Sequence, residues 1–394
     1  MRHRIVVLGA GYAGLIAAKR IAAQLRAETV DVTLVNADPD FVERIRLHQV
    51  AANQQLPRRP LVELLHGTCV QLVVDRVVRL DVEHREVELA ADGAGRTLGY
   101  DTLVYALGSV TDTGSVPGAA EHTWSVSGAA DAAALRQRLA EREAQAVAVV
   151  GGGLTGIETA TELAESYPEH RVMLLDAGRV GGWLSTPAQR HLRRVLDRLD
   201  VEVRDETSVS TVNPETLITP DGTEIPADTT VWAAGFRPPE IAREAGLAVT
   251  PTGRIQVDAT MRSRSHPEVY AVGDAAAVAG PGGAELRMCC AAGSPMAGKA
   301  ADVIAARLTG RRPGTFWFRF FGQCVSLGRN DGLVQLVRAD DTVTGRVLTG
   351  RKAARVKEFI SRGAAWPVRH PGPYRPVRRR PAQIAALRTE SANR

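Results

Sequence analysis

The chain has 394 residues, 44% of them hydrophobic and 24% charged, a composition typical of a globular protein with room for two or three domains. No run approaches the roughly 18 consecutive apolar residues that span a bilayer, which excludes a transmembrane helix. The net charge of +5 is uneven, because residues 351–394 carry twelve Lys and Arg against two Glu, and the preceding residues therefore sum to about −5.

The first predicted unit is a strand, a tight turn, a helix and a second strand. Residues 4–8 have the apolar pattern of a buried parallel strand, and this run is too short for the apolar segment of a signal peptide. Residues 15–25 have helical spacing, and residues 32–35 predict the next strand. With neither a signal peptide nor a spanning helix predicted, we expect a cytoplasmic protein.

A G-x-G-x-x-G turn follows the first strand, made by Gly9, Gly11 and Gly14 with Tyr12 and Ala13 inside it. The first glycine permits the tight turn, the second lets a pyrophosphate approach the backbone, and the third lets the helix pack on the strand. The N-terminus of that helix then faces the phosphates. A glycine turn without a ligand is the alternative, but the flanking strand and helix favour a bound dinucleotide.

The end of the second strand offers an amide where such units usually carry an acid. A carboxylate at this place accepts hydrogen bonds from ribose hydroxyls, whereas this chain has Asn36, with Asp38 two residues later. The amide oxygen of an asparagine also accepts such bonds, without help from a charge. We take Asn36 as the ribose contact and Asp38 as the alternative.

The same layout recurs near the middle of the chain. Residues 146–150 predict a strand, 157–166 a helix and 171–175 the next strand. The turn at Gly151 lies 142 residues after the turn at Gly9. Two Rossmann-like units in one chain predict two bound dinucleotides. The residues expected to bind the nucleotide at the second turn are Gly151, Gly153, Leu154, Thr155 and Gly156.

Asp176 ends the strand that follows the second turn, 20 residues after Gly156. A carboxylate there accepts hydrogen bonds from a ribose 2′-hydroxyl and repels a 2′-phosphate. The sequence therefore favours NADH over NADPH, although the nearby Arg179 would weaken that preference. The alternative is a surface aspartate that merely ends a strand.

A third region begins near residue 316. Its pattern predicts three short strands and a helix, followed by a tail in which five prolines make a continuous helix implausible. The predicted elements are strands at 324–328, 332–337 and 344–348 and a helix at 353–362.

Three further predicted strands end at a glycine, namely at Gly108, Gly235 and Gly273, and the third continues into Asp274. With these strand ends and its two glycine turns in this order, the chain resembles the pyridine nucleotide–disulfide oxidoreductase superfamily of FAD proteins. The resemblance implies that Asp274 binds the ribityl chain of FAD, that Gly108 lies near FAD and that Gly235 lies near NADH. The first turn is then expected to bind FAD and the second NADH.

Within that superfamily the chain is most similar to the type II NADH dehydrogenases. The similarity rests on Arg46-Leu47-His48-Gln49, on Glu158, on the strand around Val325-Ser326 and on the lack of a C-x-x-C or C-x4-C pair. It implies that Glu158 lies near the nicotinamide and that His48 runs along the flavin, so both are candidate catalytic residues. The alternatives are that Glu158 only interacts favourably with the dipole of its helix from the first turn, and that His48 only positions FAD. The further expected cofactor contacts are Arg44, Val78, Gly273 and Ala291.

The electron acceptor stays open. Type II dehydrogenases line the quinone pocket with a glutamine-containing helix after the Gly-Asp motif, whereas residues 288–296 of this chain contain no glutamine. Adjacent cysteines rarely form a disulfide, so Cys289 and Cys290 are expected to be small residues beside the flavin. Without a redox cysteine pair, electrons should pass directly from the flavin to a quinone or to a small biosynthetic molecule. A redox sensor without an acceptor is the third hypothesis.

The basic tail leaves three interpretations open: a solvated end, a contact with anionic lipid on the inner face of the membrane, or a subunit contact in a homodimer. A basic tail without a recognition fold does not predict nucleic-acid binding. The partners expected are thus a nicotinamide nucleotide and an unidentified acceptor, and the cofactors are FAD and NADH, with no metal.

The fold class that follows is α/β, with two Rossmann-like dinucleotide-binding domains, the NAD domain inserted in the FAD domain, and a smaller C-terminal α+β region. The expected boundaries are 1–118 with 250–315 for the FAD domain, 119–249 for the NAD(H) domain, 316–366 for the C-terminal region and 367–394 for the basic tail.

Overall fold

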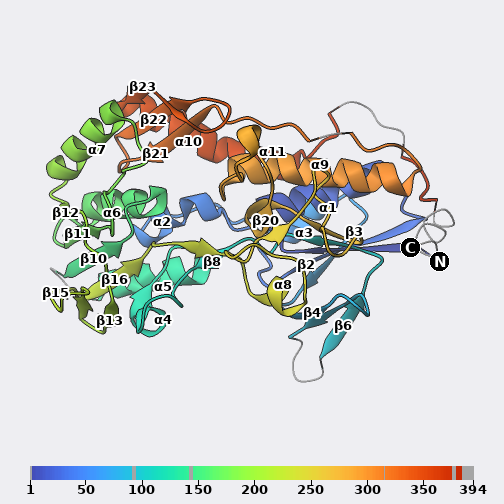
Figure 1. Cartoon of the computed structure of the whole chain (residues 1–394), viewed down its shortest axis with the longest axis horizontal. Coiled ribbons are helices and arrows are strands. Elements are labelled where there is room, and N and C mark those ends of the chain that lie inside the picture. The colour runs from blue at the N-terminus through green and yellow to red at the C-terminus, as the bar shows by residue number, and fades with distance from the viewer. Residues whose placement is uncertain (1, 91–94, 142–144, 315, 375–378, 384–394) are drawn as a thin grey trace.

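The first unit is built on a five-stranded parallel sheet, seen towards the right of Figure 1. The structure, a computed structural model, describes residues 2–90, 95–141, 145–314, 316–374 and 379–383. The long helices α1 (Tyr12–Gln24) and α9 (Cys290–Leu308) pack against each other over this sheet. Its strands in spatial order are β19 (Val269–Ala271), β7 (Thr102–Tyr105), β1 (His3–Leu8), β2 (Val30–Asn36) and β3 (Val70–Val74).

A second five-stranded parallel sheet forms the second unit, at the left of Figure 1. Its helix α6 (Leu154–Ser166) follows the second glycine turn, and α5 (Ala129–Ala140) and α7 (Thr186–Arg198) belong to the same unit. Its strands in spatial order are β12 (Glu202–Arg204), β11 (Arg171–Leu175), β10 (Ala146–Val150), β16 (Thr229–Trp232) and β9 (Thr123–Trp124).

The second unit is inserted into the first. β19 comes after the whole second sheet along the chain and yet pairs with β7 of the first sheet. A short antiparallel pair, β8 (Val110–Thr111) with β17 (Phe236–Arg237), joins the two units. The predicted α/β class with two Rossmann-like units is thereby confirmed.

Both helices after the glycine turns begin three residues earlier than predicted, α1 at Tyr12 and α6 at Leu154. The reason lies in the first glycine of each turn, because Gly9 at φ +91° and Gly151 at φ +115° adopt a conformation open mainly to glycine. The backbone therefore turns from the strand into the helix within two residues, and each helix begins early. Gly11 and Gly153 are then the extended N-cap residues of their helices.

The C-terminal region is a three-stranded antiparallel sheet covered by one helix. Its strands are β21 (Gly322–Ser326), β22 (Gly332–Val337) and β23 (Val343–Thr349), and α10 (Gly350–Ala364) packs across them. One face of the sheet contacts α6 and α7 of the second unit (Figure 1). This region therefore lies where the two units meet.

The basic tail folds back onto the first unit instead of forming a free end, at least where the structure describes it. Lys19 of α1 donates hydrogen bonds to the carbonyls of Val368 and Arg369, both at 3.0 Å, at the end of α11 (Trp366–Arg369). Further along, the Gln383 amide donates to the carbonyl of Leu308 at the end of α9, at 2.7 Å. Residues 375–378 and 384–394 of the predicted tail lie outside the described residues.

Smaller elements complete the fold. Among the described residues, no helix is long and apolar enough to cross a bilayer. The remaining helices are α2 (Leu47–Ala51), α3 (Leu61–Leu65), α4 (Ala119–His122) and α8 (Ile241–Glu244), with short 3-10 turns at Arg44–Arg46, Gly273–Ala275 and Pro281–Gly283. The remaining strands are β4 (Val77–Asp81), β5 (Glu86–Leu89), β6 (Arg96–Gly99), β13 (Thr211–Asn213), β14 (Thr216–Ile218), β15 (Glu224–Pro226), β18 (Ile255–Gln256) and β20 (Ala276–Ala277).

Candidate functional site

The two glycine turns have the same geometry. A Cβ atom on Gly14 would lie 1.8 Å from the carbonyl oxygen of Gly9, and one on Gly156 would lie 1.8 Å from that of Gly151, so neither position admits a side chain. A Cβ on Gly11 or Gly153, by contrast, would meet no atom within 4 Å. Each turn therefore leaves open space at its middle glycine, which is where a pyrophosphate approaches in a dinucleotide site.

Asn36 and Asp176 hold the two turns in matching ways. The Asn36 Oδ1 atom accepts a hydrogen bond from the Ala10 amide at 2.8 Å, and the Asp176 Oδ2 atom accepts one from the Gly152 amide at 2.6 Å. Asp176 also accepts from the Gly178 amide at 2.8 Å through its other oxygen. Each carboxylate oxygen keeps a second lone pair, so a ribose hydroxyl can still donate to Asp176.

The predicted strand ends of the first unit meet at one edge of its sheet, because all its strands are parallel. Gly108 follows β7 and Gly273 follows β19, with φ angles of +69° and +73°. Ser109 donates a hydrogen bond from its hydroxyl to Asp274 Oδ2 at 2.8 Å. A Cβ on Gly273 would lie 3.2 Å from the Cβ of Ala13, so Gly273 and Asp274 lie beside the first glycine turn.

Arg44 bridges the two units at this edge. Its guanidinium donates to the Ser109 carbonyl and lies 5.4 Å from the centre of the Phe236 ring, which directly follows Gly235. Burial lowers the pKa of Arg44, and nearby Asp274 opposes that shift. A partly buried cation thus lies between the strand end at Gly108 and the strand end at Gly235.

The beginning of α9 reaches the same place. Gly293, in the first turn of the helix, packs on Gly273, since a Cβ on Gly293 would lie 3.4 Å from the Gly273 Cα. Cys289 is the N-cap residue and Cys290 the first helical residue, both partly buried and both free thiols. Ala291 is exposed at this helix end. Burial raises the pKa of Cys290 to about 11, so its thiol stays protonated.

One buried hydroxyl faces this region without a partner. The Tyr12 hydroxyl is buried and has no hydrogen-bond partner within the described part of the chain. Burial raises its pKa, so it is a neutral donor. With the open space at Gly11 and the carboxylate of Asp274, it gives the first site the donors and acceptors that a dinucleotide needs, and these residues fit FAD.

Val78 lies outside this arrangement. It belongs to β4 in a separate three-stranded sheet, and its side chain is 46% exposed. Its predicted contact with a cofactor stays a prediction.

Glu158 and His48 are brought together in a buried cluster. Glu158 is 3% exposed, and its Oε2 atom lies 4.0 Å from His48 Nδ1. Its Oε1 atom accepts a hydrogen bond from the Ser326 amide at 2.9 Å and forms a salt bridge of 2.8 Å with Lys357 Nζ. Lys357 also donates to the Cys324 carbonyl at 3.3 Å. The cluster joins α2, α6, β21 and α10.

The charges in this cluster follow from their partners. Burial alone would raise the pKa of Glu158, but Lys357, His48 and two hydrogen bonds together hold it below its ordinary value. For Lys357 the same ion pair outweighs burial and raises the pKa. Burial lowers the pKa of His48 to about 4. At neutral pH the cluster therefore holds a carboxylate, an ammonium and a neutral imidazole.

The dipole explanation of Glu158 is wrong. Because α6 begins at Leu154, Glu158 is its fifth residue, and the first turn contains no acidic residue. The carboxylate is stabilised by Lys357 and Ser326, from the C-terminal region, instead of by the helix end.

Lys357, Ser109 and the pair of Arg46 with Glu358 were not predicted from the sequence. Arg46 Nη2 donates to Glu358 Oε1 at 3.2 Å, which fixes α10 beside the His48 segment. The predicted helix at 353–362 contains Lys357. Nothing in the sequence distinguishes this buried lysine from the exposed basic residues around it. Ser326 stands in a strand that the resemblance had used, without a role assigned to it.

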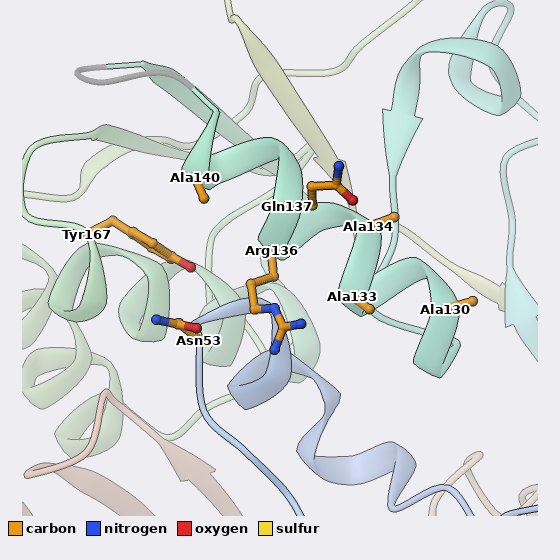
Figure 2. Close-up of a pocket in the computed structure, with 8 residues that line it drawn as sticks. All are labelled: Asn53, Ala130, Ala133, Ala134, Arg136, Gln137, Ala140 and Tyr167. Atoms are coloured by element: carbon orange, nitrogen blue, oxygen red, sulfur yellow. The ribbon is translucent and has the colours of Figure 1, made fainter.

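A surface pocket elsewhere on the molecule is a different feature. A pocket of about 580 Å³ lies between α5 and the end of α6, lined by alanines of α5 with Asn53, Arg136 and Tyr167. Figure 2 shows Arg136, Asn53 and Tyr167 pointing into the space beside α5. Tyr167 follows the last residue of α6, so the pocket lies roughly 20 Å from the glycine turn at the other end of that helix. Within the described ranges, no group of three or more metal-binding side chains occurs.

Comparison with known proteins identifies the family. The model of the pyridine nucleotide-disulphide oxidoreductase family matches residues 3–301. The chain belongs to this family. It is accordingly an NADH-dependent oxidoreductase that uses FAD and NADH, and the family assignment made from the glycine turns and strand ends is confirmed.

Particular relatives are consistent with this. The chain is 33% identical over 315 residues to an NADH dehydrogenase-like protein of Mycobacterium tuberculosis, covering 74% of this chain and 78% of the relative. It is 26% identical over 399 residues to a type II NADH:quinone oxidoreductase of Staphylococcus haemolyticus, covering 93% and 96%. Among solved structures, NDH2 of Plasmodium falciparum in complex with NADH superposes with a TM-score of 0.80 at 14% identity, over 94% of this chain and 96% of that one, which shows a shared fold.

Proposed function

We propose that this protein oxidises NADH and passes the electrons through FAD directly to a quinone at a membrane surface. The observation that supports this most is the buried cluster of Glu158, His48 and Lys357, because it joins α6 of the second unit to α2 and to α10 of the C-terminal region. Quinone reduction consumes protons as well as electrons. A buried ammonium paired with a carboxylate is a means of supplying them.

FAD would be held at the first turn, with the pyrophosphate at the open side of Gly11 and the ribityl chain at Asp274. When bound, FAD supplies the hydride and electron transfer chemistry. The chain's own contribution is to orient it and exclude water. Ser109 orients Asp274 through the 2.8 Å hydrogen bond, and Arg44 holds the backbone of Ser109.

NADH would be held at the second turn, with its pyrophosphate at Gly153 and its adenosine ribose at Asp176. The turn and Asp176 are already fixed to each other by the bond from the Gly152 amide. The binding site therefore needs little rearrangement when the nucleotide enters. A 2′-phosphate would meet the Asp176 carboxylate and be repelled.

We expect D176N to narrow the preference for NADH over NADPH by roughly tenfold, because it removes the repulsion of the 2′-phosphate. The amide oxygen can still accept from the Gly152 amide, which holds the turn, while the bond from the Gly178 amide is lost. Steady-state kcat/KM for both nucleotides measures the change. N36D is a control at the other turn and should leave the ratio of the two kcat/KM values where it is; an unaltered ratio in D176N would contradict the assignment.

In the acceptor half-reaction, Lys357 Nζ would hold the proton to be donated, with Glu158 Oε1 2.8 Å away to stabilise it. His48 Nδ1 lies 4.0 Å from the other carboxylate oxygen and is neutral, so it can receive a proton and pass it on to the cluster. At the start of α9, Cys289 and Cys290 contribute protonated thiols, where a glutamine-containing helix would contribute amides.

The outer face of α10 supports the membrane location. Val356, Phe359 and Ile360 are exposed on it, Phe359 at 78%, and Trp366 continues the stripe at 54%. These residues share one face of a helix by their spacing. Exposed basic residues flank the stripe, namely Arg351, Lys352, Arg355 and Arg362. A helix of this kind suits an anionic membrane surface. The same helix carries Lys357 on its inner face.

A double substitution F359S/I360S should abolish most binding to anionic liposomes while leaving NADH reduction of the flavin unchanged, because both side chains point away from the cluster. Co-flotation with liposomes of phosphatidylglycerol and phosphatidylcholine measures it. V62S, at another exposed valine on the first unit, is the matched surface control. Equal flotation of all variants would overturn the membrane proposal without affecting the redox one.

The decisive test of the function is a pair of half-reactions. FAD-loaded protein mixed anaerobically with NADH should lose its flavin absorption within a single turnover, and a soluble quinone analogue added afterwards should restore it quickly. Reduction by NADH without reoxidation by quinones would contradict the proposal. The second candidate is an oxidoreductase for a small biosynthetic molecule, which the lack of glutamine in residues 288–296 favours. Reduction by NADH without reoxidation by quinones would support this second candidate.

A further inference from the structure

A pair of opposite charges lies at the start of α9, outside the glycine turns and the Glu158 cluster. Arg287 stands two residues before the N-cap Cys289, and its guanidinium donates to both carboxylate oxygens of Asp341, through Nε at 2.5 Å and Nη2 at 3.4 Å. The same guanidinium lies 4.8 Å from the centre of the Phe320 ring. Arg287 thus has a defined position although its side chain is 36% exposed.

Buried amides fix Asp341 in turn. Gln323 donates to Asp341 Oδ1 at 3.0 Å, and Gln335 donates to Gln323 Oε1 at 2.6 Å. Gln335 is fully buried and accepts a hydrogen bond from the Ser185 amide at 3.0 Å. Each member of this buried network has a partner, which makes the network rigid.

The network continues to the second glycine turn. Ser185 ends a loop in which the Gly181 amide donates to the Gly152 carbonyl at 3.0 Å. An unbroken path of packed and hydrogen-bonded groups therefore leads from the turn proposed for NADH, across the C-terminal sheet, to Arg287. The residues of this path come from three regions of the chain that are far apart in sequence.

The start of α9 is also where a charge would act on FAD. Gly293 of its first turn packs on Gly273, next to Asp274, which the proposed function assigns to FAD. The N-terminus of a helix carries partial positive charge, and a fixed cation there adds to it. A carboxylate that pairs with the cation offsets part of that effect.

We infer that Arg287 is a positioning residue for electron transfer. Its positive charge favours the reduced flavin through the start of α9, and the carboxylate of Asp341 offsets part of that effect. The inference rests on the proposed placement of FAD at the first turn. It gives the C-terminal sheet a second role, since Gln323 and Gln335 set where the charge pair stands. Removal of either charge then shifts the same equilibrium in opposite directions.

The test uses the full FAD-loaded chain equilibrated with a redox dye, with the ratio of reduced to oxidised flavin read from the absorption spectra. R287M should lower that ratio about three- to tenfold at a fixed dye ratio, and D341N should raise it by a similar factor. R287K should stay close to the wild type because it keeps the charge. Asp341 has a φ of +70°, which asparagine also tolerates, so D341N should not strain the backbone.

Matched controls are R4M and D101N. Arg4 and Asp101 form a similar pair, with Arg4 Nη2 at 3.1 Å from Asp101 Oδ1, at the opposite end of β1 and roughly 17 Å from Gly9. They change the net charge equally and should move the ratio less than twofold. A shift of R287M and D341N in the same direction, or none beyond the controls, would overturn the inference.

The dye reduces the flavin without NADH, so this result does not depend on the nucleotide or the quinone. Should R287M fail to fold, D341N alone decides: a rise in the ratio supports the inference and no rise overturns it. Failure of NADH to reduce the wild-type flavin would instead contradict the proposed function.

Discussion

Alanine in place of Gly11 should give a folded protein that binds FAD poorly, whereas G153A should retain FAD and lose its reduction by NADH. A Cβ at either position meets no protein atom within 4 Å, so the fold has room for it. The methyl group would occupy the space where the pyrophosphate approaches. Each charged hydrogen bond lost there is worth about 1.5–3 kcal/mol, so the nucleotide affinity should fall on the order of ten- to a hundredfold.

The measurements are the FAD content of the purified protein and the rate of flavin reduction against NADH concentration. G363A is the matched control, since a Cβ at Gly363 also meets nothing within 4 Å and the residue lies in α10. That change should leave both nucleotides bound. If G11A affected only NADH and G153A only FAD, the assignment of the two turns would be reversed.

G14A should behave differently, and the contrast makes the first pair informative. Its Cβ would lie 1.8 Å from the Gly9 carbonyl oxygen and 3.2 Å from the Cβ of Ala106. The helix would have to move off the strand. We expect G14A to be largely insoluble, which circular dichroism and expression yield would report.

The elements around the turns could be predicted because their signals are local. The strands at 146–150 and 171–175 coincide with the observed β10 and β11. Each unit is predicted by signals that lie within some 30 residues of one another. These signals are alternating or continuous apolar runs, a glycine that can adopt a positive φ and a carboxylate at the end of a strand. The helix starts were missed by three residues because the tight turns at Gly9 and Gly151 let each helix begin directly after its N-cap glycine.

The Glu158 cluster could be predicted only in part. The resemblance named Glu158 and His48, but Lys357 lies 199 residues after Glu158 in the sequence. Their contact depends on how α10 packs on its sheet and how β21 of that sheet packs on α6, and no local pattern in the sequence indicates that packing. One lysine among the basic residues of α10 differs from the others only in facing inward.

The tail shows a similar limit. Its charge left a solvated end, a lipid contact and a subunit contact open. The described residues of the tail are instead held on the first unit by their backbone carbonyls, which accept hydrogen bonds from Lys19 and Arg20. Backbone groups are present in every sequence, so composition cannot reveal which of them will find a partner. The apolar stripe on α10, by contrast, follows from the helical spacing of Val356, Phe359 and Ile360 along the sequence.

Breaking the Glu158–Lys357 pair should cost both stability and the acceptor half-reaction, and the two losses should separate in a double variant. E158Q or K357M alone leaves one buried charge without its partner, which typically costs about 3–5 kcal/mol. The double variant E158Q/K357M removes both charges and should recover most of the stability. If the pair supplies protons to the acceptor, the double variant should still reoxidise its flavin roughly a hundredfold more slowly.

Thermal melting and single-turnover reoxidation by a quinone analogue provide the two readings. Reduction by NADH should stay within a fewfold of wild type in all three variants, because the glycine turn of the second unit is untouched. R193M at the exposed Arg193–Asp205 pair is the control for losing a salt bridge. Recovery of both stability and reoxidation in the double variant would show that the pair is only structural.

The pH dependence of melting gives an independent check with a definite sign. In the wild type the depressed pKa of Glu158 adds stability above its ordinary value of 4.5, and this is lost as the pH falls through its folded value. The raised pKa of Lys357 adds stability below its ordinary 10.5, lost as the pH rises through its folded value. His48 binds a proton at 6.5 when unfolded but only at about 4 when folded, so stability also falls as the pH drops below 6.5.

In K357M the contribution of Glu158 to the pH dependence of stability should change sign. Without the ammonium, burial dominates and the pKa of Glu158 should rise above 4.5. The folded state then binds the proton more tightly than the unfolded state, so the melting temperature should fall as the pH rises from about 4.5, whereas the Glu158 contribution in the wild type is already complete there and no longer changes with pH. The slope of K357M between pH 5 and 7, compared with that of E158Q/K357M, isolates Glu158, since only the first variant retains the carboxyl group. Equal slopes would mean that Lys357 is not what keeps this buried carboxylate charged.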